Sequence, residues 1–304
     1  MNSGFDLIGD VHGRYEQLCL LLHKLGYRQS NGCFRHPERQ LIFAGDLIDQ
    51  GKAQRKTIEL VRAMVDQGAA QLVLGNHEYN AICYATEDPN RHGHFLRPHN
   101  DKNNRQHSAF LSEYAADPKA YREIIDWLLR RPLFIDNGKL RVIHACWHPA
   151  SLALVRPLLS NGYHLNQAFL LASAHRGSAE WQAIESLLKG PELMLPEGCF
   201  FQDKYSNPRR DIRVRWWMNN HPSYRDVALV PSGQQLQIPN TPIKASLCGY
   251  DDTRPLFIGH YWLSGPPRLM TPYIACLDYS ADNQLVCYRW QGESRLKPEH
   301  FVSL

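Results

Sequence analysis

The sequence has no long hydrophobic run and no strong excess of one charge. None of its apolar runs approaches the roughly 18 residues that a membrane-spanning helix needs, so we expect no membrane partner. A cleavable signal peptide is not expected either, because the first candidate site residue, Asp10, leaves no room ahead of it. The net charge of +4 suits an anionic substrate, but many housekeeping enzymes are as basic.

The sequence also has no closely spaced cysteine pair. Its eight cysteines are scattered without a C-x-x-C motif, and several lie inside apolar runs. This pattern predicts reduced thiols in the core and excludes a disulfide framework or a zinc knuckle. We therefore expect a cytoplasmic protein.

The composition is that of a globular protein, with 43% hydrophobic and 21% charged residues. A length of 304 residues allows about two domains. The candidate ligands described next span both halves of the chain and must converge, which favours one catalytic domain over residues 1–304. We expect insertions at about 84–120 and 150–235, which form a cap or rim.

Three short apolar runs each end in a glycine followed by polar residues. Residues 5–8 lead into GDVHG (9–13), residues 41–44 into GDLIDQG (45–51), and residues 71–74 into GNHE (75–78). Each run predicts a buried strand, and α/β sheets carry their chemistry at the carboxyl ends of strands. Helical patterns over 15–26 and 53–68 separate these strands. The mixture of oxygen and imidazole ligands suits Mn, Fe, Zn or Co.

These motifs, in this order, resemble the first three signatures of calcineurin-like metallophosphoesterases. More closely, they resemble the phosphoprotein phosphatase superfamily and the bacterial symmetrical diadenosine tetraphosphate hydrolases. VIH (142–144) and FIGH (257–260) are similar to the later signatures, which are single histidines near strand ends. The resemblance implies an α/β (α+β) metallophosphatase fold with two packed mixed β-sheets flanked by helices.

The resemblance also implies two divalent metal ions, most simply Mn, with Fe, Zn, Co or Ni as alternatives. Its ligand sets are Asp10, His12 and Asp46 for one ion, and Asp46, Asn76, His144 and His260 for the other. A hydroxide that bridges the ions would attack phosphorus directly. His77 would protonate the leaving oxygen, oriented by Asp49.

Two positions depart from the family pattern. Where the relatives carry an arginine after the position of Asp49, this chain has Gln50, which supplies no charge to clamp a phosphate. Arg14, Lys52, Arg55 or Arg215 could compensate for it, and Arg14 and Arg215 are the candidate phosphate-binding residues. Trp262 stands where many metallophosphoesterases have a second histidine. The absence of that histidine resembles the phosphoprotein phosphatase type.

The resemblance favours a phosphoesterase of the Ser/Thr protein phosphatase type, acting on a phosphorylated small molecule, nucleotide or phosphoprotein. One alternative is a hydrolase of diadenosine polyphosphates. Another is a non-catalytic metal- or nucleotide-binding protein on the same fold. A nucleic-acid-binding module using the arginines of residues 209–215 ranks last, because this basic stripe is short.

Several smaller features complete the prediction. Residues 91–107 read as a loop, and its histidines, at 92, 94, 99 and 107, fit no standard metal-ligand spacing. Cys146 is expected to be an inert thiol, and His148 is a minor candidate for the site. Two closing strands over 274–279 and 285–290 are expected at the edge of a second sheet.

Overall fold

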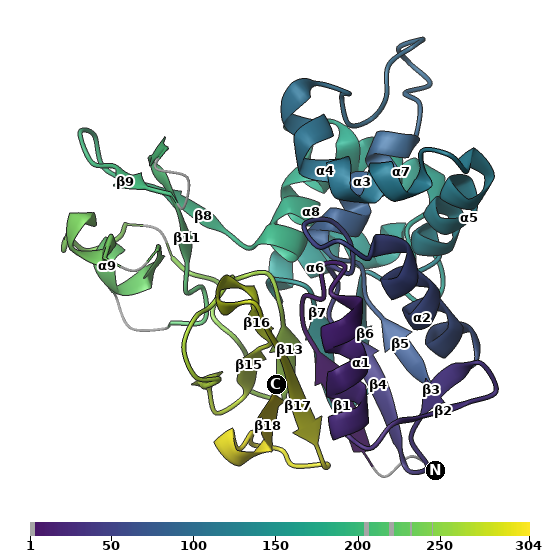
Figure 1. Cartoon of the computed structure of the whole chain (residues 1–304). Helices are drawn as coiled ribbons and strands as arrows, with labels where there is room; N and C mark the ends of the chain where they lie inside the picture. The colour runs from purple at the N-terminus through teal and green to yellow at the C-terminus, as the bar shows by residue number, and fades with distance from the viewer. Residues whose placement is uncertain (1–3, 204–206, 219–221, 232, 245) are drawn as a thin grey trace.

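The computed structural model describes residues 4–203, 207–218, 222–231, 233–244 and 246–304, which form two mixed β-sheets with helices around them (Figure 1). The first sheet has the strand order β16-β17-β1-β4-β5, with β18 beside β17. Its strands are β1 (Gly4–Ile8), β4 (Arg39–Phe43), β5 (Ala70–Leu72), β16 (Asp278–Tyr279), β17 (Gln284–Trp290) and β18 (Phe301–Ser303). Strands β1, β4 and β5 are parallel, and β17 is antiparallel to β1.

The second sheet has the order β14-β15-β13-β7-β6. Its strands are β6 (Phe134–Asp136), β7 (Arg141–Ile143), β13 (Leu256–Ile258), β14 (Leu269–Thr271) and β15 (Ile274–Cys276). Strand β13 is parallel to both β7 and β15, whereas the two edge strands are antiparallel to their neighbours. The expected metallophosphatase fold with two mixed sheets is confirmed.

The two sheets pack face to face through side chains that alternate along each strand. Leu7 and Ile42 of the first sheet belong to the same buried cluster as Val142 and Phe257 of the second. Their sequence neighbours point to the opposite faces, where they join the cluster that includes the helices. This alternation with a period of two residues fixes the strand register, because a one-residue slip would exchange the two faces.

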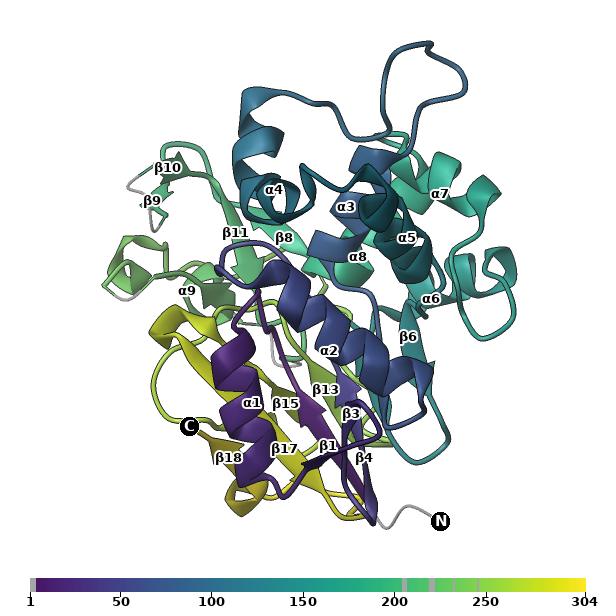
Figure 2. The same cartoon turned by 45° about the vertical axis from the view of Figure 1, so that its right-hand side comes forward.

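Helices lie in front of the first sheet in Figure 2, and others are gathered toward the top of that view. The longer ones are α1 (Tyr15–Lys24), α2 (Gln54–Asp66), α3 (Asn76–Ala85), α4 (Asp101–Tyr114), α5 (Pro118–Leu129), α6 (Pro149–Val155), α7 (Gln167–Ala174) and α8 (Ala179–Lys189). Helix α1 contacts β17 and α2 contacts β5, whereas α6 and α7 pack on α8. No helix in the described ranges is both long and apolar enough to cross a membrane.

The expected second insertion, 150–235, begins with α6–α8 and continues into an arm that projects to the left in Figure 1. The arm contains a three-stranded sheet, β8 (Glu192–Met194), β11 (Asp211–Val214) and β12 (Ala228–Leu229), and the pair β9 (Phe201–Gln202) and β10 (Pro208–Arg209), with α9 (Tyr224–Val227). Residues 204–206, 219–221 and 232 of this segment lie outside the described residues. The assignment of the chain as one domain with two insertions stays a prediction.

Two local predictions were wrong. Residues 91–107 are not one loop, because α4 begins at Asp101, where the Asn100 side chain accepts a hydrogen bond from the Asn103 backbone N–H. The two closing strands do not lie together at one edge. Strand β15 lies inside the second sheet, whereas β17 lies inside the first, between β16 and β1. The second prediction failed because β17 pairs with β1, a strand from the other end of the chain.

We predict that Phe257→Ala will destabilise the protein by about 3–5 kcal/mol, because it opens a cavity between the sheets. Phe257 is fully buried, and its ring lies 5.2 Å from that of Tyr288. Urea unfolding measures the change. The matched control is Phe200→Ala in the arm, where 54% of the residue is exposed and the expected change is within about 0.5 kcal/mol. Equal effects of the two substitutions would contradict the packing described.

Candidate functional site

The predicted site residues lie at five strand ends that meet at one edge of the two sheets. Asp10, Asp46 and Asn76 follow the parallel neighbours β1, β4 and β5. His144 and His260 follow β7 and β13, which are parallel neighbours in the second sheet. Because parallel strands bring their carboxyl ends to the same edge, residues from positions 10 to 260 converge there.

Asp46 lies between two groups of ligand atoms. Its Oδ2 is 3.2 Å from His144 Nε2 and 3.9 Å from the Nε2 atoms of His12 and His77. The ligand atoms of His12, Asp46 and His77 all lie within 4.8 Å of one another, and so do those of Asp46, His144 and His260. The aspartate is therefore common to both groups.

Asn76 and Asp10 complete this arrangement. Asn76 Oδ1 is 2.8 Å from His260 Nδ1 and 3.1 Å from His144 Nε2. The Asp10 carboxylate accepts the backbone N–H of His260 at 3.2 Å, and its Oδ2 is 3.9 Å from His12 Nε2. All six predicted metal ligands are brought together, and none is more than 7% exposed.

Backbone carbonyls fix the tautomers of two of the histidines. His12 Nδ1 is 2.8 Å from the Ile48 carbonyl oxygen, and His144 Nδ1 is 2.7 Å from that of Ala44. A carbonyl oxygen only accepts, so each Nδ1 carries a proton and donates it. Each Nε2 then faces the cluster, the usual orientation of a histidine that binds a metal.

Several site residues adopt a left-handed backbone that side chains rarely take. The φ angles are 49° at His12, 52° at Asp46, 67° at Asp49 and 72° at His260. Such conformations cost about 1–3 kcal/mol each and persist where surrounding contacts hold them.

Glu78 supplies those contacts for Asp46. Its buried carboxylate accepts the backbone N–H groups of Gly75 at 2.9 Å, Asp46 at 2.8 Å and Leu47 at 2.8 Å. It therefore ties the start of α3 to the loop after β4. The glutamate of the GNHE motif therefore has a structural role, which is to hold the backbone around Asp46.

At two of the glycines that precede predicted ligands, a carboxylate lies too close to the glycine Cα to leave room for a side chain. A Cβ on Gly75 would lie 2.2 Å from Asp46 Oδ1, and one on Gly259 would lie 2.2 Å from Asp10 Oδ1. Any side chain at either position would push the carboxylate out of the cluster.

The cluster is a buried set of carboxylates and imidazoles, and their charges shift one another's pKa values. Burial, together with the charges of Asp278 and Asp46, raises the pKa of Asp10 well above its usual value. Burial disfavours the charged form of Asp46, but the charges of His144 and His77 prevail and hold its pKa well below the usual range. Burial opposes protonation of His144 and His77 as well, yet Asp46 raises their pKa values to about 10 and about 9. The charges of Asp46 and of these two imidazoles thus stabilise one another.

Asp49 and His77 form the predicted pair. His77 Nδ1 is 2.6 Å from Asp49 Oδ2, and the His77 backbone N–H bonds to Asp46 Oδ1 at 3.0 Å. A second histidine, His107, reaches the other oxygen of Asp49, with Nδ1 2.9 Å from Oδ1. Sequence reasoning did not connect His107 to the site, because it lies in the stretch that reads as a loop.

Arg14 bonds to the backbone beside the site. Its Nε donates to the Val11 carbonyl at 2.9 Å and its Nη2 to the Asp10 carbonyl at 2.5 Å. Its Nη1 is buried and has no hydrogen-bond partner. Burial lowers the pKa of this guanidinium.

Arg213 lies in β11 and Arg215 directly follows it, and the two arginines have different partners. Arg213 Nη1 donates to the carbonyl of His260 at 3.3 Å, whereas Arg215 Nη1 donates to the Asp226 carbonyl at 2.6 Å. Arg213 thus contacts a predicted ligand residue, and Arg215 contacts the arm. Gln50 also faces the site, with its Nε2 3.1 Å from His12 Nε2.

The remaining sequence candidates lie outside the cluster. His148 Nδ1 accepts the backbone N–H of Ser151 at 3.1 Å and so caps α6. Cys146 is buried, its Sγ 3.7 Å from that of Cys248, and burial raises the pKa of its thiol. His99 stacks on Tyr84, with ring centroids 3.8 Å apart.

Asp278 is a further residue that no motif revealed. It is 2% exposed, and its Oδ2 accepts the backbone N–H of Trp262 at 2.6 Å, which holds the turn after His260. Its charge also raises the pKa of Asp10. Asp278 begins β16, and this strand brings it to the site from a part of the sequence that contains no motif.

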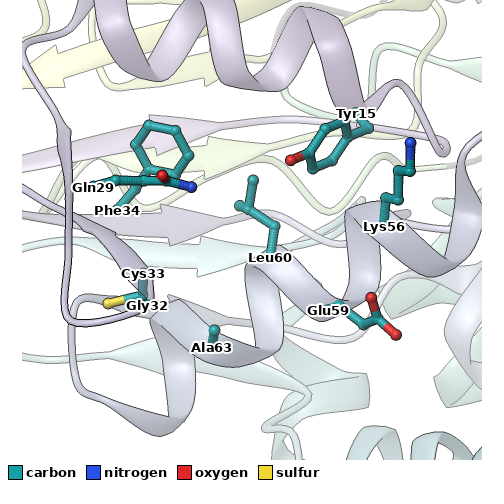
Figure 3. Close-up of a pocket in the computed structure, with 9 residues that line it drawn as sticks. All are labelled: Tyr15, Gln29, Gly32, Cys33, Phe34, Lys56, Glu59, Leu60 and Ala63. Atoms are coloured by element: carbon teal, nitrogen blue, oxygen red, sulfur yellow. The ribbon is translucent and has the colours of Figure 1, made fainter.

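Two surface hollows in the described part of the chain lie away from these residues. One, of about 230 Å³, lies between α1, α2 and the hairpin of β2 (Arg28–Ser30) and β3 (Cys33–Arg35), lined by Tyr15, Phe34 and Lys56 among others (Figure 3). The other, of about 440 Å³, includes Gln17, Asp282 and Leu304. Neither contains a residue of the cluster.

Comparison with known proteins agrees with this geometry. The asymmetrical bis(5'-nucleosyl)-tetraphosphatase PrpE of Bacillus subtilis (strain 168) is 34% identical over 146 residues, which cover 46% of this chain and 57% of that protein. The protein of the same name from Halalkalibacterium halodurans is 49% identical over 74 residues, which cover 24% of this chain and 30% of that protein. The matched region thus spans 57% of the length of the first relative and 30% of that of the second.

A solved structure shares the fold. A protein serine/threonine phosphatase from Saccharomyces cerevisiae superposes with a TM-score of 0.52 and 14% identity, covering 100% of this chain and 79% of that one. The sequence model of the calcineurin-like phosphoesterases matches residues 5–184. With this match over more than half of its length, the chain belongs to the calcineurin-like phosphoesterase family.

Proposed function

We propose that this protein is a metal-dependent phosphoester hydrolase that acts on bis(5'-nucleosyl) polyphosphates such as diadenosine tetraphosphate. The observation that carries the proposal is the pair of ligand groups that share Asp46. The dinucleotide substrate is favoured because the matching relatives are named for it. A Ser/Thr phosphatase activity, the first expectation from the sequence, has the support of a common fold alone.

Two divalent ions fit the chemistry of the donor set. Asp10, His12 and Asp46 would hold one ion, and Asp46, Asn76, His144 and His260 the other. Burial and the charges of Asp278 and Asp46 disfavour the ionised form of Asp10 and raise its pKa, and a bound cation would offset these effects. Mixed oxygen and imidazole ligands suit Mn, Fe, Zn or Co, and of these we propose Mn as the native metal.

When bound, such ions supply an acidified water as nucleophile and offset charge on the phosphoryl oxygens. The chain itself supplies the proton for the leaving oxygen, from Nε2 of His77. The Asp49 carboxylate accepts a hydrogen bond from His77 Nδ1 at 2.6 Å, and a carboxylate at this position favours the protonated imidazole. A positioned imidazolium contributes about 10²–10⁴-fold to such a step.

Arginines beside the cluster would bind the phosphates in place of the arginine replaced by Gln50. The unpartnered Nη1 of Arg14 supports its role. Of the two later arginines, Arg213 contacts His260 and is favoured over Arg215, whose guanidinium bonds to the arm. A cytoplasmic location stays a prediction from the cysteine pattern.

Metal binding by the chelated protein should release protons and weaken as the pH falls. His144, whose pKa is about 10, carries a proton on Nε2 that an ion must displace at neutral pH. Each displaced proton lowers the affinity about tenfold per pH unit of acidification. Calorimetry of Mn²⁺ binding in buffers of different ionisation enthalpy counts the protons.

The matched control for this titration is His148→Asn, which changes the cap of α6 and should leave proton release unchanged. His144→Asn should remove one released proton and weaken binding. Binding with no proton release and no pH dependence would contradict the assignment of His144 as a ligand.

Turnover should be highest with diadenosine tetraphosphate in a panel that also contains a phosphopeptide and p-nitrophenyl phosphate. Asp46→Asn should lower kcat about a hundredfold or more, because both ion sites lose their shared carboxylate. Asp252→Asn, at an exposed acid, is the control. Chromatography of the products gives ATP and AMP for asymmetrical cleavage and only ADP for symmetrical cleavage.

Other outcomes of this panel have definite meanings. Preference for the phosphopeptide would replace the dinucleotide by the Ser/Thr phosphatase function. No turnover with two ions bound would identify a metal- or nucleotide-binding protein that has lost catalysis. Tight, steeply salt-dependent binding of oligonucleotides would instead support a nucleic-acid partner.

A further inference from the structure

His107 lies apart from every family motif, yet it is built into the site. It comes from the middle of α4, and it is only 4% exposed. Its ring lies 4.9 Å from that of Phe110 and 5.3 Å from that of Tyr84, so apolar contacts fix its orientation. A buried imidazole with this packing has little freedom to turn away from its partner.

That partner is the oxygen of Asp49 that His77 does not use. His107 Nδ1 is 2.9 Å from Asp49 Oδ1, and His77 Nδ1 is 2.6 Å from Asp49 Oδ2. An ionised carboxylate only accepts hydrogen bonds, so both imidazoles donate from Nδ1. Asp49 is therefore held between two histidines, and its backbone N–H bonds to Gln54 Oε1 at 2.8 Å.

The second donor matters because a carboxylate bound at one oxygen can rotate about its Cβ–Cγ bond. The hydrogen bond from His107 prevents this rotation and directs Oδ2 at His77. His77 Nδ1–H then stays bound to Asp49, so its Nε2 faces Asp46, 3.9 Å from Oδ2. Burial disfavours ionised Asp49, and the hydrogen bonds from His107 and His77 offset this and lower its pKa.

We propose that His107 is a positioning residue for catalysis, which holds Asp49 so that His77 presents its Nε2 proton to the leaving oxygen. This inference rests on the proposed function. As the bond from phosphorus to the leaving oxygen breaks, the proton on His77 Nε2 passes to that oxygen. Asp49 and His107 exchange no proton in this step. Helix α4 thus contributes to catalysis through His107.

The test compares His107→Asn with His107→Leu in Mn²⁺-loaded full-length protein. Asparagine places an amide N–H where Nδ1 lies, whereas leucine has the same branching and no donor. The substrates are p-nitrophenyl phosphate, whose leaving group needs no proton, and phenyl phosphate, whose basic leaving group does. His107→Leu should lower kcat for phenyl phosphate about 10- to 100-fold and that for p-nitrophenyl phosphate less than about threefold, with KM unchanged.

His107→Asn should restore phenyl phosphate turnover to within about threefold of the wild type. In a His77→Asn background, His107→Leu should cause no further loss, because the two residues act in one step. If His107→Leu does not fold, His107→Gln takes its place. Its amide lies one bond further out, and it should show the same substrate selectivity.

Equal losses for both substrates, equal behaviour of the Asn and Leu variants, or additive losses with His77→Asn would each overturn the positioning role. In those cases wild-type turnover that depends on Asp46 would leave the proposed function intact. A wild type that turns over neither these substrates nor diadenosine tetraphosphate would overturn both proposals together. A wild type active on diadenosine tetraphosphate alone would retain the proposed function, and the variants would then be compared on that substrate.

Discussion

The site depends on one buried carboxylate held in an unfavourable backbone conformation. Asp46 has a φ of 52° and stands between two groups of imidazoles. Glu78 holds it there by accepting the backbone N–H groups of Asp46 and of Gly75, and Gly75 leaves room for the Asp46 oxygen. The free energy that would otherwise be lost to strain and to crowded charge is offset by these hydrogen bonds and by the bound cations that we propose.

The fold provides this arrangement through strand order. Two sheets, each with parallel strands at its centre, bring their carboxyl ends to one edge. Three ligand-bearing loops come from the first sheet and two from the second, so the cluster joins the sheets above the apolar layer between them. Residues as distant in sequence as Asp10 and His260 contact each other directly there.

Much of this was predictable from sequence because the motifs lie at strand ends, where short apolar runs stop, which is a local pattern. The six predicted ligands and the Asp49–His77 pair were inferred from the family resemblance of these motifs, and the structure brings all of them together. His107 and Asp278 were not found, because their contacts are made by a helix and a strand distant from every motif. The position of β17 inside the first sheet was missed for the same reason, since pairing between the ends of a chain leaves no trace in periodicity.

A crystal structure of the protein grown with Mn²⁺, with anomalous scattering recorded to locate the ions, tests the shared-carboxylate centre most directly. We expect two peaks, one on each side of the Asp46 carboxylate, with His12 beside one and His144 and His260 beside the other. Protonated imidazoles would no longer be needed to neutralise Asp46. A single peak, or ions bound away from Asp46, would contradict the shared-carboxylate centre.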